Sequence, residues 1–162
     1  MYSVGIITAS DKGSIGERED VSGKLIEEIV VEHGYQVVHY IVLPDDRTTL
    51  KNEMIHMADE LNLNLIITTG GTGFSQRDIT PEASLEVIER NVPGIAEAMR
   101  MNSYKITPRA ILSRGVAGIR GKTLIINLPG SPKAVKESLE FIIDQLDHGI
   151  KILIGEDSEC AR

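Results

Sequence analysis

The chain has 162 residues, which is the size of one compact domain with a substantial core. Hydrophobic residues make up 41% of it and charged residues 25%, values that are typical of globular proteins and exclude disorder, collagen-like repeats and coiled coils. Aromatic residues are only 4%, with no tryptophan, so we expect an aliphatic core and no surface that stacks successive bases on aromatic rings. An evenly spread net charge of −7 would disfavour binding to nucleic acid or to anionic membranes.

The charge is not evenly spread along the chain. Residues 98–136 contain no Asp or Glu and eight of the 17 basic residues, so nine basic residues face 24 acidic ones elsewhere, a net charge of −15. The eight are Arg100, Lys105, Arg109, Arg114, Arg120, Lys122, Lys133 and Lys136. Two interpretations stay open: an ordinary solvated surface, or a strip that receives a small polyanion.

The N-terminal residues and the cysteine content bear on location and metal binding. Residues 1–7 enter an apolar run with no preceding basic residue, and no apolar run approaches the eighteen or so residues of a membrane span, so we expect a cytoplasmic protein that does not bind membranes. Cys160 is the single cysteine and lies in a polar tail, residues 156–162, so no internal disulfide is possible. The four histidines lack paired ligand spacing and do not predict a zinc site.

The first half of the chain alternates strands and helices. Residues 2–8 form a predicted strand that ends in the polar loop 10–14, and Asp20 is placed to cap a helix that ends at Gly34. Residues 35–43 form a second strand, a helix with apolar positions from Leu50 to Leu61 follows, and the apolar residues 63–69 read as a central strand buried on both faces. This order predicts a right-handed parallel α/β arrangement.

The second half completes one α/β domain. Thr80-Pro81 opens a predicted helix that runs through residue 90, another helix covers residues 93–103, and short strands at 116–119 and 123–127 flank a turn. A last helix begins at Ser131-Pro132 and runs to about residue 150. We therefore predict a three-layer α/β sandwich with a mostly parallel sheet, as a single domain over residues 1–155.

Two glycine loops follow predicted strands. Gly70-Gly71-Thr72-Gly73 comes directly after the buried third strand, and residues 127–133 lie between the last strand and the last helix. Ligands of open parallel sheets bind at the carboxyl ends of the strands, where backbone N–H groups and helix N-termini receive anions. The alternative is that the glycines only make tight turns, since the first loop matches neither a P-loop nor a dinucleotide-binding fingerprint.

Acidic residues are predicted at the same edge of the sheet. Asp45 follows the second strand, Asp78 the third, and Asp20 lies close to the loop after the first. Carboxylates beside amides that hold phosphate repel a bare polyanion, so their presence favours Mg²⁺ bridging protein and nucleotide oxygens, and hence phosphoryl or nucleotidyl transfer. Each carboxylate has helix capping or turn formation as its alternative, and for Asp46 capping is the preferred one. Ser113 and Arg114 lie in the acid-free segment and add a hydroxyl and a cation.

Several motifs, in order along nearly the whole chain, resemble those of the MogA/MoaB family, which includes the G domains of gephyrin. They are residues 68–74, 77–83, 93–94, 107–108, 112–114 and 127–132. The resemblance implies the molybdopterin-binding, MogA-like fold and a homo-oligomer, a trimer or a hexamer. It also implies a role in molybdenum cofactor synthesis, in which the terminal phosphate of molybdopterin attacks the α-phosphorus of Mg-ATP to give adenylyl-molybdopterin and pyrophosphate. A MoeA-type protein would insert the metal in a later step.

Carried over residue by residue, the resemblance implies a set of site residues. Asp45 and Asp78 would be the carboxylates tied to Mg²⁺ and turnover, with Asp20 as a third acid. The nucleotide and phosphate groups would be held by Gly70, Gly71, Thr72, Gly73, Asn127, Pro129, Gly130 and Ser131. The pterin would be held by Ser113, Arg114, Thr80 and Pro81. We therefore expect part of the acid-free segment to bind phosphates, and a non-catalytic molybdopterin carrier of the MoaB type is the alternative to an active adenylyltransferase.

Overall fold

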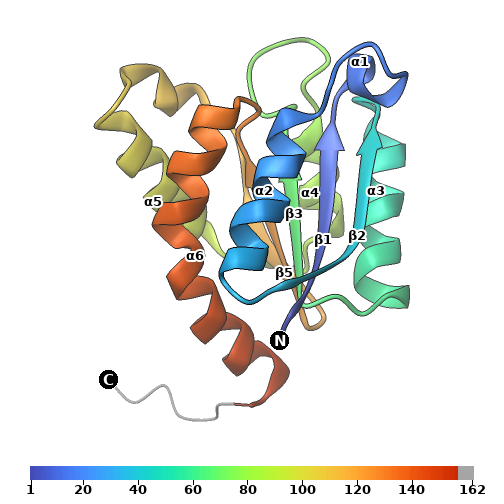
Figure 1. The fold of residues 1–162 in the computed structure, drawn as a ribbon, viewed down its shortest axis with the longest axis vertical. Helices are drawn as coiled ribbons and strands as arrows, with labels where there is room; N and C mark the ends of the chain where they lie inside the picture. Colours follow the sequence, from blue (N-terminus) through green and yellow to red (C-terminus); the bar gives the residue numbers. More distant parts are fainter. Residues whose placement is uncertain (157–162) are drawn as a thin grey trace.

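The computed structural model describes residues 1–156 and contains one six-stranded sheet (Figure 1). The strand order is β2-β1-β3-β6-β5-β4, in which the first four strands are parallel and β5 is antiparallel to both of its neighbours. The strands are β1 (Ser3–Ala9), β2 (Gln36–Leu43), β3 (Leu65–Thr69), β4 (Arg90–Asn91), β5 (Ala117–Arg120) and β6 (Thr123–Leu128). The predicted mostly parallel sheet is confirmed.

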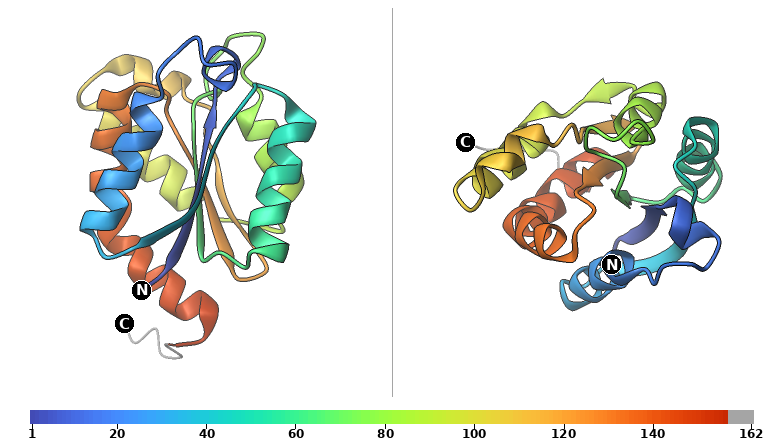
Figure 2. Two further views of the ribbon diagram at one scale, coloured as in Figure 1. Left: turned by 45° about the vertical axis from the view of Figure 1, so that its right-hand side comes forward. Right: turned by 90° about the horizontal axis from the view of Figure 1, so that it is seen from above.

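Helices cover both faces of this sheet, which gives the predicted three layers (Figure 2). One core cluster packs Ile26 of α2 and Leu139 of α6 against the sheet, and the other packs Met54 of α3 and Val87 of α4 against the opposite face. The helices are α1 (Asp11–Ser14), α2 (Val21–Glu32), α3 (Arg47–Ile55), α4 (Thr80–Val87), α5 (Pro93–Tyr104) and α6 (Pro132–Ile154). A π turn, η1 (His56–Glu60), extends α3, and a 3-10 turn, η2 (Pro108–Leu112), follows α5.

Strand β3 lies in the centre of the sheet and is buried along its whole length. Leu65 and Ile67 pack into the core cluster on the α2 and α6 side, whereas Ile66 packs into the cluster on the α3 and α4 side. This alternation follows from the two-residue repeat of a strand, and it explains why a strand with helices on both faces is apolar throughout.

The structure corrects two sequence predictions and adds an element that was not predicted. The helix predicted through residue 90 ends at Val87, because Glu89 N donates to Ile119 O and Val92 N donates to Ala117 O, so β4 covers the edge of β5. The polar loop predicted at 10–14 contains the short helix α1, capped by Ser10. The segment between α5 and β5 forms the turn η2. Cys160 and most of the predicted tail lie outside the described residues.

The loops that follow β1, β2, β3 and β6 meet at one end of the sheet, the upper end in Figure 1. This follows from the parallel direction of the four strands, which places all their carboxyl ends together. Within residues 1–156, no helix combines the length and the apolar character needed to cross a membrane.

Asp20 joins three elements at this end of the sheet. As the N-cap of α2, its Oδ1 accepts from Gly23 N at 2.9 Å, while its Oδ2 accepts from Thr8 Oγ1 of β1 at 2.6 Å and from the Tyr40 hydroxyl of β2. The predicted capping role is confirmed. Burial, followed by the hydrogen bond to Asp20, raises the pKa of Tyr40, so its hydroxyl keeps the proton that it donates. These contacts are structural and do not test the catalytic role of Asp20, which stays a prediction.

The substitution Gly23→Ala tests this junction. A Cβ at residue 23 would lie 2.2 Å from Asp20 Oδ2 and 2.6 Å from Thr8 Oγ1, so the junction would have to open. We expect a loss of about 1–3 kcal/mol in the free energy of unfolding, measured by urea denaturation. The control is Gly149→Ala within α6, where a Cβ meets nothing within 4 Å and should stabilise the helix by about 0.5–1 kcal/mol. Equal stabilities of the two variants would contradict this account.

Candidate active site

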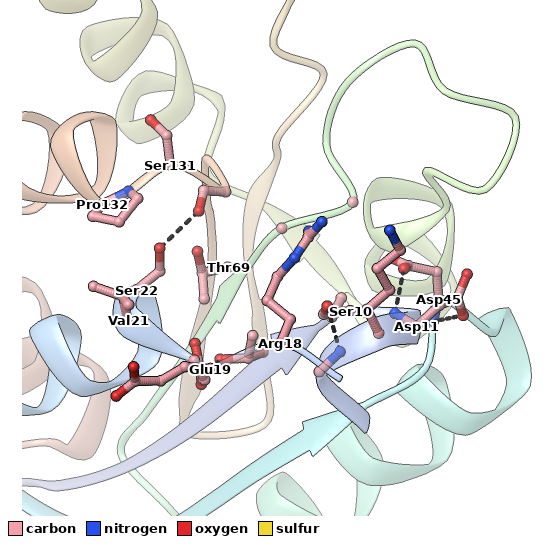
Figure 3. Close-up of a pocket in the computed structure, with 18 of the residues that line it drawn as sticks. Ser10, Asp11, Arg18, Glu19, Val21, Ser22, Asp45, Thr69, Ser131 and Pro132 are labelled. Atoms are coloured by element: carbon pink, nitrogen blue, oxygen red, sulfur yellow. Dashed lines mark hydrogen bonds between the residues drawn. The ribbon is translucent and has the colours of Figure 1, made fainter. Parts of the chain in front are cut away.

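A cavity of about 690 Å³ lies at the carboxyl ends of the parallel strands (Figure 3). The loops after β1, β2, β3 and β6 all contribute to its walls, as does the start of α2. Of the residues predicted for the site, it brings together Asp20, Asp45, Gly70, Gly71, Asp78, Gly130 and Ser131. The topology therefore assembles the predicted carboxylates and parts of both glycine loops around one space.

The first glycine loop requires glycine at two positions. Gly70 has a φ of +89° and Gly71 a φ of +67°, both in the left-handed region. A Cβ at residue 70 would lie 2.5 Å from Ala9 O, and one at residue 71 would lie 2.4 Å from Thr80 Oγ1 and 3.1 Å from Asp45 Oδ1. The loop thus passes directly against the end of β1 and against the Asp45 carboxylate, which no larger residue would allow.

The second glycine loop is held against the first. Thr69 Oγ1 donates to Pro129 O at 2.7 Å, and Ser22 Oγ of α2 donates to Gly130 O at 2.7 Å. A Cβ at residue 130 would lie 3.4 Å from Gly70 Cα, so a methyl group there would reach van der Waals contact with the first loop. Ser131 caps α6 by accepting from Ala134 N, which leaves the helix N-terminus beside the cavity.

Asp45 is held by a reciprocal contact with the loop after β1. Asp11 N donates to Asp45 Oδ2 at 3.0 Å, and Asp45 N donates to Asp11 Oδ1 at 3.0 Å. Burial is the main cause that raises the pKa of Asp45, and the charges of Asp11 and Asp78 raise it further. Burial therefore disfavours the ionised form of Asp45, which the hydrogen bond from Asp11 N and the charge of Arg77 favour.

Arg77 connects this contact to the loop after β3. Its Nε and Nη2 each donate to one oxygen of Asp11 at 2.9 Å, a bidentate pair that lowers the pKa of Asp11. The adjacent residue, Asp78, accepts at Oδ2 from Ser75 N at 3.0 Å and lines the cavity. The pair thus ties the loop after β3, which carries Asp78, to the loop after β1, which contacts Asp45.

The loop after β6 also lines a second cavity, of about 220 Å³. Pro129 lines the second cavity and Gly130 the first, so consecutive residues of this loop line the two spaces. The second cavity has a mostly apolar wall from α5, η2 and α6, with Ser113 and Arg109 among its polar side chains. The second cavity is smaller than the first and is lined by fewer acidic side chains. This difference is expected if the two cavities bind ligands of different kinds.

Several predicted site residues lie in the framework rather than on either cavity wall. Thr80 and Pro81 are buried at the start of α4, and Thr72 and Gly73 lie in the loop that precedes it. Arg114 donates to Gly73 O at 2.8 Å, to Asp78 O at 3.0 Å and to Glu82, so it holds the Gly70–Asp78 loop in place. The roles predicted for these residues in ligand binding stay predictions.

Asn127 has its side chain fully engaged within the protein. Its Nδ2 donates to Thr68 Oγ1 at 2.9 Å and to Ser84 Oγ at 2.8 Å, and its Oδ1 accepts from Val116 N at 3.2 Å. The residue is buried and joins β3, α4 and the chain before β5, while part of it lines the second cavity. Its amide therefore positions the loop that separates the two cavities.

The acid-free segment does not supply cations to the larger cavity. None of its eight basic residues lines that cavity, whereas Arg100 and Arg109 line the second one. Arg100 donates to Ser113 O and Gly115 O, and Arg120 pairs with Asp59. In this segment, some basic side chains therefore form ion pairs or contact backbone carbonyls, and some line the second cavity.

Sequence reasoning missed the loop after β1 as a part of the site. Asp11, Lys12 and Arg18 all line the larger cavity, although the sequence drew attention only to Asp20 in this region. The rule that led to the loops after β2 and β3 applies equally to β1, because its carboxyl end lies at the same edge. The position of this loop at the carboxyl end of β1 was therefore the signal that could have identified it as part of the site.

Comparison with known proteins agrees with this geometry. Residues 5–148 match the family described as "Probable molybdopterin binding domain". The chain is 45% identical to a molybdopterin adenylyltransferase of Helicobacter pylori over 94% of this chain and 88% of that protein. It is 38% identical to a molybdopterin adenylyltransferase of Escherichia coli over 87% of this chain and 73% of that protein.

A solved structure agrees with the fold. The crystal structure of the molybdopterin biosynthesis enzyme MoaB from Thermus thermophilus superimposes with a TM-score of 0.91 at 48% sequence identity, covering 96% of this chain and 98% of that one. The family match spans most of the chain and the structural match spans nearly all of it. The chain therefore belongs to the MogA/MoaB family of molybdopterin-binding proteins.

Proposed function

We propose that this protein is a molybdopterin adenylyltransferase in molybdenum cofactor biosynthesis. In the proposed reaction, an oxygen of the terminal phosphate of molybdopterin attacks the α-phosphorus of Mg-ATP. A new P–O–P linkage forms, the bond between the α-phosphorus and its bridging oxygen breaks, and pyrophosphate leaves. Adenylyl-molybdopterin is the product, and a MoeA-type protein would use it for metal insertion. The high identity to proteins named molybdopterin adenylyltransferase supports this assignment.

The observation that carries the proposal is the pair of cavities lined by consecutive residues of the loop after β6, Pro129 in one cavity and Gly130 in the other. The acidic cavity has the volume and the glycine loops for a nucleotide, and the smaller cavity has an apolar wall with hydroxyls, including that of Ser113, for a pterin. Substrates in the two cavities would both contact the loop after β6. Holding two reactants next to each other is itself a large part of catalysis in nucleotidyl transfer.

The carboxylates of the larger cavity fit Mg²⁺ that is shared with a nucleotide. Among residues 1–156, no group of three or more His, Cys, Asp and Glu side chains forms a complete metal site. Mg²⁺ bound through one or two carboxylates and completed by substrate phosphates and water requires no such group. Asp45 and Asp78 would hold the ion, which would neutralise charge on the phosphates when bound.

The two glycine loops would orient the phosphates in this proposal. Gly70 and Gly71 bring the backbone close to the ligand, and the N-terminus of α6 beside Ser131 offers N–H groups and a favourable dipole. The contacts from Thr69 and Ser22 hold these groups in place before the substrate binds. Preorganised donors of this kind stabilise the charge that develops in the transition state.

The assembly and location of the protein are also proposals. Met101 and Tyr104 on α5 and Ile111 in η2 are exposed apolar side chains that lie close together around a shallow pocket. This surface supports the homotrimer implied by the family, and light scattering after gel filtration would distinguish it from a monomer or a hexamer. Use of ATP is consistent with the cytoplasmic location expected from the sequence.

Asp78→Asn tests the proposed chemistry directly. We expect this variant to bind molybdopterin and to lose adenylyl-molybdopterin formation by on the order of 100-fold or more, because the carboxylate that would hold Mg²⁺ is gone. Formation of the product and release of pyrophosphate would be measured with purified molybdopterin and Mg-ATP. The control Asp144→Asn removes an exposed carboxylate of α6 and should leave the rate unchanged.

Two outcomes would contradict the assignment. Unchanged turnover in Asp78→Asn would remove this carboxylate from the mechanism. A wild-type protein that binds molybdopterin and releases no pyrophosphate from ATP would be a carrier rather than an adenylyltransferase.

Arg77→Gln tests the electrostatics of the metal site. The Arg77 cation lowers the pKa of Asp45, so its removal should raise that pKa further above its usual value. Since Mg²⁺ binds the ionised carboxylate, the acid limb of the activity profile should move to higher pH in this variant. The pKa of Asp45 would be followed by NMR titration of its carboxyl carbon, with Arg90→Gln as the control. A lowered or unchanged pKa of Asp45 would refute this role of Arg77.

A further inference from the structure

The larger cavity carries an excess of acidic side chains and two basic ones. Asp11, Glu19, Asp20, Asp45 and Asp78 line it, and among the described residues the basic side chains on its wall are Lys12 and Arg18. A nucleotide brings several further negative charges into this space. Mg²⁺ held by Asp45 and Asp78, as proposed above, would neutralise only part of that charge, so we expect other cations to face the rest of the polyphosphate.

Most of the acidic side chains in the wall already have partners. Asp11 is paired with Arg77, Glu19 with Lys24, and Asp20 accepts three hydrogen bonds. By contrast, within residues 1–156 no side-chain hydrogen bond or ion pair holds Lys12 or Arg18. The cavity therefore keeps two free cations, while three of its five acids have partners within the protein.

Arg18 also has the orientation that a ligand contact needs. Figure 3 shows its side chain extended into the cavity, between Thr69 on one side and Ser10 on the other. Both Arg18 and Lys12 lie in the segment between β1 and α2, whose ends are held by the Asp11 contacts and by the Asp20 cap. The segment is thus anchored on both sides of the residues that carry the free cations.

We propose that Arg18 and Lys12 bind the polyphosphate of the nucleotide, including the pyrophosphate that leaves. This inference rests on the proposed function and adds to it the source of the positive charge, which is the loop after β1 and not the acid-free segment 98–136. A guanidinium donates to two phosphate oxygens at once, and an ammonium adds a mobile point charge. Arg18 and Lys12 are binding residues in this proposal, and Asp45 and Asp78 remain the metal ligands.

Calorimetric titration of the full chain tests the proposal, with Mg-ATP and with inorganic pyrophosphate as the probes. Arg18→Ala and Lys12→Ala should each weaken binding of both probes about tenfold or more, since a hydrogen bond to a charged group is lost. The variants should also show a smaller decrease in affinity with added salt. Arg18→Lys, which keeps the charge and loses the two-fold donation, should fall between Arg18→Ala and the wild type.

Matched controls come from the opposite end of the sheet. Arg90 lies in β4 next to Ile119, and Lys122 lies in the turn between β5 and β6, so Arg90→Ala and Lys122→Ala remove the same charges away from the cavity. Both controls should bind within twofold of the wild type. All four replaced side chains are exposed, and unchanged melting temperatures would verify that the variants are folded.

The outcomes separate this inference from the proposed function. If the wild type binds Mg-ATP and forms adenylyl-molybdopterin while Arg18→Ala and Lys12→Ala bind both probes within twofold of it, the inference is wrong and the function stands. Equal weakening in the two control variants would show a general effect of net charge and would also overturn the inference. If the wild type binds pyrophosphate and neither binds nor uses Mg-ATP, the proposed function fails while the anion site remains.

Discussion

The close contact between the two glycine loops is the constraint on which the site depends. Strands β3 and β6 are neighbours in the centre of the sheet. The loop that follows β3 therefore runs beside the loop that follows β6. A methyl group added at Gly130 would already contact Gly70 Cα, and the hydrogen bond from Thr69 to Pro129 O fixes the spacing of the loops. Two cavities form where these loops meet, because the loop after β6 has one cavity on each side.

Much of the fold was predictable because its signals are local. The apolar run of β3, the cap at Asp20 and the Pro at the start of α4 and α6 each determine an element within a few residues. The end of α4 and the strand β4 were not predictable in this way. They depend on the hydrogen bond from Glu89 N to Ile119 O, between residues 30 positions apart, and local propensity contains no information about such pairing.

The candidate site was predictable where it depends on strand order and less so where it depends on side-chain contacts. The rule for parallel sheets located Asp45, Asp78 and both glycine loops, and the structure brings these together. Sequence alone did not show that Arg114 holds a loop by its backbone carbonyls or that the Asn127 amide is buried. A basic residue in a sequence has the same formal charge whether it faces a ligand or an internal acceptor.

The segment between β1 and α2 links the stability of the fold to the chemistry proposed for the site. Asp20 at its end caps α2 and joins β1 to β2, and Asp11 at its start holds Asp45 and receives Arg77. A net charge of −7 is thus compatible with a polyanionic substrate, since the acids in this region are bound internally and Arg18 is left free. Charge counted over the whole chain says little about a ligand, because what the ligand meets is the charge that the fold leaves uncompensated at one cavity.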